Sequence, residues 1–170
     1  MAAPAPSLRA RALRLLATRE YSRIELERKL ARTIKPSENE SAPDLAALAA
    51  LLDELQALGL LDEQRFAESL ARRRQAKYGR QRIALELRSH GLDGDLVDHV
   101  LGSQREPELL RAQHILRRRY PEPAATAQER ARQQRFLLAR GFGREVVMQA
   151  IRGERGADAS HLAGDADGES

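Results

Sequence analysis

Apolar residues along this chain recur at the spacing of helix turns through most of its length. Leu45, Leu48, Leu52 and Leu55 give the clearest case, since steps of three and four residues place their side chains on one helix face. The same spacing predicts about nine helices in all. No stretch worth assigning to a strand alternates with a period of two, so the chain is predicted to be all-α.

Signals for helix ends accompany these stripes. Two sequences of the capping-box type, in which Ser or Thr is followed three residues later by Glu, are predicted to begin helices at 22–25 and 126–129. Gly59, Gly91 and Gly141 follow apolar stripes directly. Glycine reaches the left-handed conformation at low cost, so these residues are predicted to end helices at positive φ.

Parts of the sequence are repeated. The segment at 21–30 returns at 78–87 with an offset of 57 residues, and the segment at 87–101 returns at 137–151 with an offset of 50. Repeats of this size predict stacked helical units, each of which buries its apolar face against the next. We therefore expect an elongated tandem array of three three-helix repeats, without an obvious single catalytic pocket.

The repeats and the composition of the segments around them predict the organisation of the whole chain. The predicted parts are a flexible N-terminus at 1–7, a first repeat at 8–61 with a polar insertion at 35–41, a second repeat at 62–104, a third repeat at 105–152 and a disordered acidic tail at 153–170. The tail is assigned as disordered because it is rich in Gly, Asp and Ala and has few apolar residues to bury.

Composition and charge narrow the possible environments and partners. The chain has no Cys, which excludes disulfides and thiolate metal sites and is compatible with the cytoplasm. No apolar run approaches the ~20 residues of a membrane span. The net charge is +4, and because the segment after Arg152 is acidic, the body before it carries about +8. A basic body is compatible with a polyanionic partner, although arginine is also a good helix former.

The sequence offers no recognisable catalytic chemistry. It lacks a phosphate-binding Gly-x-x-x-x-Gly-Lys-Ser/Thr loop, and its four histidines show no spacing that pairs two of them with a carboxylate on one helix face. Nothing in the sequence forms a credible nucleophile–base pair. We therefore predict that the protein is not an enzyme, and we assign no catalytic, cofactor-binding or metal-binding residue.

A basic cluster in the middle of the chain is the best candidate for a binding surface for the partner or for DNA. It consists of Arg72, Arg73, Arg74, Lys77, Arg80 and Arg82. Adjacent helical residues are ~100° apart, so the three consecutive arginines cannot all face one ligand. The alternative interpretation is an ordinary solvated face. Arg117–Arg119 is a second basic run, but its charge also favours a helix C-terminus. Tyr21 and Tyr78 could stack on bases, yet their equivalent positions favour a packing hinge.

Four motifs in order resemble the RecX family of recombination regulators, over about residues 8–152. They are Ser22-Arg23-x-Glu25-Leu26-x-x-Lys29-Leu30, Gly59-Leu60-Leu61-Asp62-x-x-Arg65-Phe66-Ala67, Gly79-x-x-Arg82-Ile83-x-x-Glu86-Leu87-x-x-x-Gly91 and Leu138-x-Arg140-Gly141-Phe142 followed by Val146-Val147 and Ile151. The insertion at 35–41 is longer than the usual turn of the family, and the acidic tail is additional.

This resemblance implies a curved, all-helical array that binds the RecA recombinase filament on DNA, in the filament's helical groove. Such a protein inhibits strand exchange and ATP hydrolysis and limits filament extension, as part of recombination, DNA repair and the SOS response. We expect a cytoplasmic monomer that contacts DNA weakly, single- or double-stranded and without sequence preference, and that does not bind membranes. The alternatives are a helix-turn-helix-like protein that binds duplex DNA directly, with Arg80, Gln81 and Arg82 at its recognition helix, and an enzyme with a site between repeats.

Overall fold

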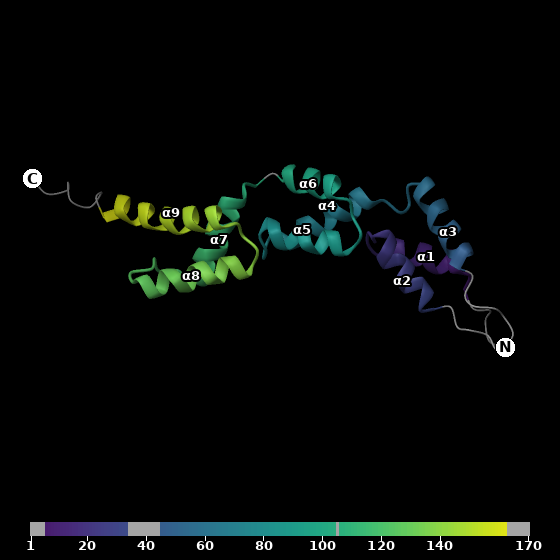
Figure 1. Ribbon diagram of the computed structural model, residues 1–170, viewed down its shortest axis with the longest axis horizontal. Helices are drawn as coiled ribbons and strands as arrows, with labels where there is room; N and C mark the ends of the chain where they lie inside the picture. The colour runs from purple at the N-terminus through teal and green to yellow at the C-terminus, as the bar shows by residue number, and fades with distance from the viewer. Residues whose placement is uncertain (1–5, 34–44, 105, 163–170) are drawn as a thin grey trace, which may run out of the picture. The chain divides into compact units, whose positions relative to one another are not determined.

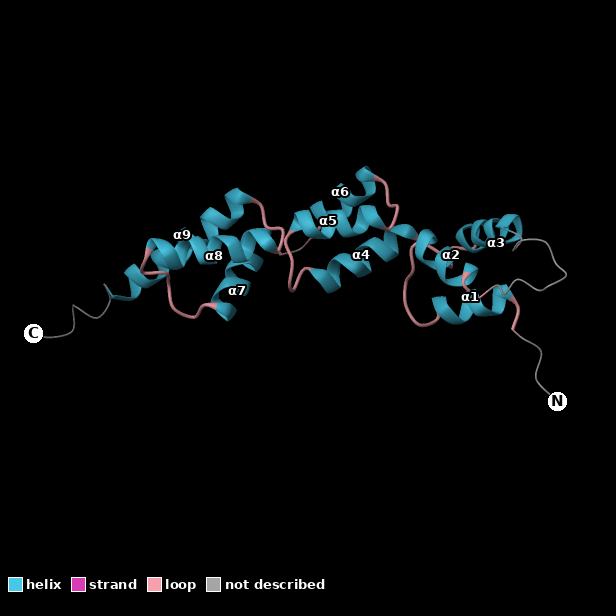
Figure 2. Ribbon diagram, turned by 60° about the horizontal axis from the view of Figure 1, so that its bottom comes forward, coloured by secondary structure: helices cyan, strands magenta, loops and turns pink. Residues whose placement is uncertain are grey.

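The computed structural model describes residues 6–33, 45–104 and 106–162, and within them the fold is entirely helical (Figures 1 and 2). The helices in chain order are α1 (Leu8–Leu16), α2 (Arg23–Ala31), α3 (Leu45–Ala57), α4 (Glu63–Arg74), α5 (Arg80–Ser89), α6 (Gly94–Gly102), α7 (Glu108–Arg119), α8 (Ala127–Ala139) and α9 (Arg144–Leu162). The prediction of an all-α protein with about nine helices is confirmed for the described residues.

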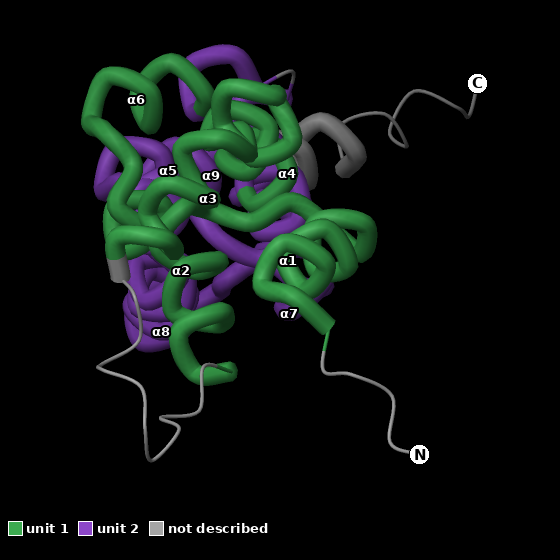
Figure 3. The backbone as a smooth tube through the Cα atoms, turned by 90° about the vertical axis from the view of Figure 1, so that its right-hand side faces the viewer, with its two compact units in different colours: residues 1–70, 87–100 green, residues 71–86, 101–170 purple. Residues whose placement is uncertain are grey.

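The chain forms two compact units, shown in separate colours in Figure 3. Unit 1 contains residues 1–70 and 87–100, and unit 2 contains residues 71–86 and 101–170. Each unit therefore combines a terminal group of three helices with part of the segment from α4 to α6. The division into repeats at 8–61, 62–104 and 105–152 stays a prediction from the sequence.

One hydrophobic cluster of the unit 1 core is formed by aliphatic side chains from α1, α2 and α3 and from Leu61 after α3, together with one tyrosine. Its buried members are Ala12, Tyr21, Leu26, Leu30, Leu48, Leu52, Leu55 and Leu61. The stripe predicted on α3 thus lies in the core at each position whose side chain is described. Arg23 on α2 and Asp53 on α3 form an ion pair of 2.7 Å at the edge of this core.

The core of unit 2 is formed where α9 packs on α7 and on α8. Its buried members are Ala112, Leu116, Leu137, Phe142, Val147, Ala150 and Ile151. Phe142 is the large side chain of this cluster, and it is fully buried directly after Gly141. The turn between α8 and α9 therefore delivers an aromatic ring into the core that both helices share.

The two predicted capping boxes differ in the structure. At α8, Thr126 accepts a bond from the amide of Glu129, and the Glu129 carboxylate accepts from the amide of Thr126, so the box is complete. At α2, Ser22 accepts from the amide of Glu25 at 3.2 Å, but the Glu25 carboxylate pairs with Arg19 instead. A nearby cation thus replaces the backbone amide as the partner of Glu25, and only half of that box forms.

Helix α9 is longer than the sequence predicts. The predicted end lies at Arg152, whereas α9 continues to Leu162. The extra segment contains Ala, Glu and Arg, which favour helices, and no Pro, so the glycines within it cost about 1 kcal/mol each without ending the helix. The helix thus extends into the segment 153–170, whose assignment as a disordered acidic tail stays a prediction from the sequence, and residues 163–170 lie outside the described part. The insertion at 35–41 and most of the N-terminus at 1–7 lie outside it too.

All three glycines that were predicted to end helices have positive φ. The angles are +66° at Gly59, +79° at Gly141 and +81° at Gly91, and among the described residues these are the positions with positive φ. In each case the glycine follows the helix and its capping residue, as expected for a left-handed C-terminal cap. The sequence prediction is confirmed here.

In unit 1 the joint between α1 and α2 docks against the end of α5. The hydroxyl of Ser22, which is fully buried, lies 3.3 Å from Nδ1 of His90, and the His90 ring meets Phe66 edge-on at 4.9 Å. A Cβ atom added to Gly91 would collide with the side chain of Ile24. The absence of a side chain at Gly91 is therefore what admits Ile24 at this contact.

In unit 2 the equivalent joint, between α4 and α5, docks against the end of α8 at the equivalent positions, but through backbone hydrogen bonds. The amide of Gly79 donates to the carbonyl of Arg140 at 2.9 Å, and the amide of Gln81 donates to the carbonyl of Gly141 at 3.1 Å. A Cβ atom on Gly79 would overlap the Gly141 backbone. The two offsets in the sequence, 57 and 50 residues, thus connect two copies of one docking contact.

Glycine is needed at these positions for two reasons, a positive φ and a lack of space for a Cβ atom. Three alanine substitutions distinguish them. In Gly59→Ala the added Cβ atom meets open space. The only cost is that alanine must adopt a positive φ, which is unfavourable by about 1–2 kcal/mol. Gly79→Ala keeps an ordinary φ but collides with backbone. Gly141→Ala combines both, since its Cβ would lie 2.6 Å from the backbone nitrogen of Arg82. We expect chemical denaturation to show the smallest loss of unfolding free energy for Gly59→Ala and the largest for Gly141→Ala.

Gly102→Ala is the matched control, because its Cβ would meet nothing within 4 Å and its φ is not positive. It should leave the unfolding free energy nearly unchanged. Equal losses for Gly79→Ala and Gly102→Ala would contradict the close backbone contact in unit 2.

The complete capping box gives α8 a pH-dependent contribution to stability. Bonds from the amides of Thr126 and Ala125 hold the pKa of Glu129 below its ordinary value of 4.5. A lowered pKa in the folded state means that the contribution is present above pH 4.5 and is lost as the pH falls through the folded value. Thermal unfolding should therefore show Glu129→Gln to be less stable than the parent at pH 6. The difference should shrink below pH 4.5, and a difference independent of pH would argue against the carboxylate's role.

Candidate functional site

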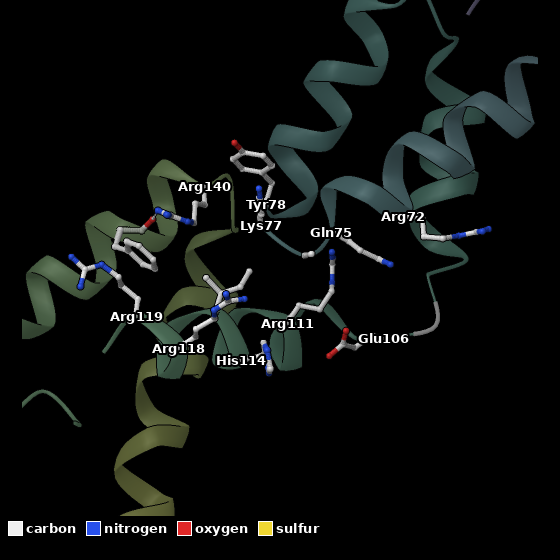
Figure 4. A pocket seen from close by; sticks show the side chains of 13 residues that line it. Arg72, Gln75, Lys77, Tyr78, Glu106, Arg111, His114, Arg118, Arg119 and Arg140 are labelled. Atoms are coloured by element: carbon white, nitrogen blue, oxygen red, sulfur yellow. Dashed lines mark hydrogen bonds between the residues drawn. The ribbon is translucent and has the colours of Figure 1, made fainter. Parts of the chain in front are cut away.

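The C-terminal end of α4 and the turn after it form one wall of a cavity within unit 2. The cavity has a volume of about 600 Å³ and is partly open to solvent. Its other walls come from one face of α7 and from the end of α8 (Figure 4). Its lining residues are Arg72, Gln75, Ala76, Lys77, Tyr78, Glu106, Arg111, His114, Ile115, Arg118, Arg119, Phe136 and Arg140.

Two of the six residues proposed from the sequence line this cavity. Arg72 and Lys77 belong to its wall, and both are exposed. Arg80 lines a smaller neighbouring cavity of about 190 Å³, and its amide donates to the Glu108 carboxylate at 2.7 Å. Arg73 is exposed and lines neither cavity. The six residues thus do not all line one cavity.

The remaining two residues of the basic cluster are engaged inside unit 2. Arg74 pairs with Glu86 through two bonds of 3.0 and 2.5 Å, and this hydrogen-bonded carboxylate raises the pKa of Arg74. Arg82 lies over the Tyr78 ring, with its guanidinium carbon 4.8 Å from the ring centroid. Arg74 also approaches that ring, at 5.9 Å. Both arginines therefore hold the joint between α4 and α5 as well as adding charge.

Arg111 is the most unusual residue of the cavity. It is 6% exposed, and its Nε and Nη1 atoms are buried without a hydrogen-bond partner in the described structure. Burial lowers the pKa of the Arg111 guanidinium, and the charges of Glu108 and Glu106 oppose that effect. A buried donor without a partner costs about 1–3 kcal/mol, more when it is charged. Arg111 therefore carries a penalty that a bound anion would relieve.

Further cations from α7 and α8 complete the cavity, and they were not proposed from the sequence. Arg118 and Arg119 come from α7, and Arg140 follows α8. The Arg140 guanidinium stacks on the Phe136 ring at 3.8 Å. The wall carries six Arg and Lys side chains against one carboxylate, that of Glu106.

A signal for Arg111 was present in the sequence. Arg111 lies four residues before Ile115, about one helical turn away, so it adjoins an apolar position of the predicted helix. An arginine on the buried face of a helix is unusual, because a charged side chain is rarely fully buried unless it is paired. The run Arg117–Arg119 is also visible in the sequence, but its positive charge is explained by its position at the C-terminal end of a helix.

The tyrosines at the two joints are packed against other parts of their own units. Tyr21 is 4% exposed and belongs to the core of unit 1, with the Arg19 guanidinium 3.8 Å from its ring centroid. Tyr78 is half-buried at the rim of the cavity. Both positions agree with the packing-hinge interpretation better than with rings offered to bases.

Two other kinds of site are absent from the described residues. No group of three or more His, Asp or Glu side chains among the described residues is placed to hold a metal ion. None of the helices in that part of the chain is long and apolar enough to cross a membrane. The cavity in unit 2 is therefore the strongest candidate site in the described structure.

Known proteins resemble this chain in sequence and in fold. Family models described as the second and the third three-helix domain of RecX match residues 62–101 and 106–151. The Regulatory protein RecX of Leptothrix cholodnii is 46% identical over 149 residues, covering 88% of this chain and 90% of the relative. That of Herminiimonas arsenicoxydans is 42% identical over 146 residues, covering 86% and 91%.

A solved structure supports the same fold. The crystal structure of RecX from Lactobacillus salivarius superposes with a TM-score of 0.69 and covers 87% of this chain and 94% of its own. The two sequences are 21% identical, so this likeness concerns the fold alone.

The ion pair of Arg74 predicts a graded response of the basic cluster to substitution. Lys77→Ala should lower affinity for a single-stranded oligonucleotide and reduce the slope of log K against log salt by ~0.7, the value for one phosphate contact. Arg74→Ala should change that slope less, because the Glu86 carboxylate already compensates its charge. Binding titrations at several salt concentrations measure both. Equal slopes for the two variants would contradict this assignment.

Proposed function

The chain belongs to the RecX family of regulatory proteins, and on that premise we propose that it regulates a RecA-type recombinase by binding the filament that the recombinase forms on DNA. Bound in the helical groove of the filament, it limits filament extension and inhibits strand exchange and ATP hydrolysis. It acts as a cytoplasmic monomer without catalytic activity of its own. The identity of 46% to a regulatory RecX protein over nearly the whole chain is the observation that carries this proposal.

The cavity of unit 2 supports a role on a nucleoprotein filament. Its six cationic side chains provide charge for DNA phosphates or for acidic residues of the recombinase. Contacts to phosphates alone carry no sequence information, so they suit a filament that forms on any DNA. We therefore propose weak DNA binding, to single or double strands and without sequence preference, as one part of filament binding.

A helix-turn-helix-like protein that binds duplex DNA directly is the alternative. Its recognition helix would be α5, whose first residues are Arg80, Gln81 and Arg82. In unit 2 the start of this helix is engaged, because the amides of Arg80 and Gln81 donate to Glu108 and to the Gly141 carbonyl. A recognition helix needs its first turns free to enter the major groove, so the filament proposal is favoured.

Three exposed cations of the basic cluster provide a test of the filament proposal. The variant with Arg72, Arg73 and Lys77 all changed to Ala should inhibit the recombinase ATPase roughly tenfold less well. An exposed ion contact contributes about 0.5 kcal/mol, so three contacts contribute about 1.5 kcal/mol, or a factor of ten. The measurement is ATP hydrolysis by filaments on single-stranded DNA, over a range of inhibitor concentrations.

A variant with Arg14, Arg28 and Arg88 changed to Ala is the matched control, because it loses the same charge from exposed positions in unit 1. It should inhibit nearly as well as the parent, and circular dichroism should show equal helicity for both variants. Full inhibition by the first variant at physiological salt would mean that its three cations form only a solvated face. Gel shifts with random duplex and with preformed filament distinguish the alternative, which requires tighter binding to the duplex.

A further inference from the structure

Arg111 combines burial, positive charge and unused hydrogen-bond donors at the wall of a cavity. Two of its three guanidinium nitrogens are buried without a partner, and only 6% of the residue is exposed. It lines both the large cavity and the smaller one beside it. In Figure 4 its side chain rises from α7 toward the turn that carries Gln75 and Lys77. Its donors are therefore directed to the space between these elements.

The surroundings of Arg111 favour an anion with more than one negative oxygen. Arg118 lies seven residues later on α7, two helical turns along the same face, and Lys77 adds a third cation from the opposite wall. Glu106 is the one carboxylate of the wall, and it is exposed. A single carboxylate ligand would satisfy Arg111 but would leave the other cations repelling one another.

The cavity has room for a phosphate-bearing group, and the geometry of arginine favours phosphate. A volume of about 600 Å³ lies within the range of small-molecule sites. Arginine binds phosphate well because its planar fork of N–H groups matches the oxygens. The cavity is partly open to solvent, so a bound phosphate can remain attached to a longer chain outside it.

We infer that the cavity of Arg111, Lys77 and Arg118 binds a phosphoryl group of a nucleic-acid backbone, with the buried Arg111 as its central donor. This inference rests on the proposed function, because it assigns DNA binding by the regulator to one site. The central residue of this site, Arg111, differs in burial from the exposed residues of the basic cluster, to which Lys77 belongs. Arg111 is positioned by the fold before any ligand arrives, whereas Lys77 and Arg118 are exposed and add attraction around it.

Arg111→Met is the main test, since Met fills similar space without charge or donors. Fluorescence anisotropy with a labelled single-stranded oligonucleotide should show at least a roughly tenfold loss of affinity. The slope of log K against log salt should fall by ~0.7. The melting temperature should stay equal or rise, because replacing a buried unpaired cation with an apolar side chain removes a penalty. A purely structural role for Arg111 would instead lower the melting temperature and leave affinity unchanged, which would overturn the inference.

Two further variants make the test independent of how Arg111→Met folds. Arg118→Met changes an exposed residue of the same cavity and should weaken oligonucleotide binding with no change in melting temperature. Arg135→Met is the matched control, because it removes one positive charge from an exposed position of α8 that does not line the cavity. Equal losses for Arg118→Met and Arg135→Met would overturn the inference in favour of a general effect of charge.

Competitors identify the source of the anion. Pyrophosphate should displace the oligonucleotide from the parent and raise the parent's melting temperature, and both effects should be lost in Arg111→Met. If pyrophosphate raises the melting temperature of the parent but Arg111→Met binds the oligonucleotide as tightly as the parent does, the site binds free phosphates. The assignment to a nucleic-acid strand is then wrong. If an acidic peptide raises the melting temperature of the parent and the oligonucleotide does not, the site binds carboxylates and the inference is wrong. All these measurements use naked DNA, so they can fail while inhibition of the recombinase filament persists.

Discussion

The docking of a helix joint on the end of a later helix is the contact on which the arrangement of each unit depends. In unit 2 the backbones of Gly79 and Gly141 touch, and two amides of the joint donate to the carbonyls of Arg140 and Gly141. Only residues without a Cβ atom allow this approach. In unit 1 the buried Ser22 and His90 make the equivalent contact through side chains, and Gly91 leaves room for Ile24. Backbone bonds with fixed direction set the position of the next helix more strictly than apolar packing does, because apolar packing has no preferred direction.

The candidate site follows from that docking. Because the amide of Gly79 is hydrogen-bonded to the end of α8, the turn immediately before it is held at the cavity that α7 also lines, with Lys77 and Tyr78 at the cavity wall. The apolar packing of α7 on α9 then fixes the face of α7 that carries Arg111. The stable core of unit 2 thus supports a buried cation that is unfavourable by itself. Such local conflicts between stability and charge are expected where a protein binds something.

Much of the fold could be predicted because its signals are local. The spacing of Leu48, Leu52 and Leu55 identifies a helix and its buried face, and Gly59, Gly91 and Gly141 mark helix ends through the conformations that glycine permits. The failures have equally local causes. Glu25 found Arg19 as a partner in place of the backbone. Helix α9 continues beyond Gly153, because the free energy that one glycine costs is smaller than the free energy that the rest of the helix contributes.

The sequence by itself determined the helices, their repetition, the glycine caps and the excess of basic residues, since each of these depends on residue type and spacing along the chain. The tertiary structure decided which cations act together. Neighbours in sequence such as Arg72, Arg73 and Arg74 have separate surroundings because helical side chains fan around the axis. Arg111 and Lys77 line one cavity although 34 positions separate them in the sequence, and only the fold of unit 2 brings them together. Burial, which gives Arg111 its unused donors, is likewise a property of the folded unit.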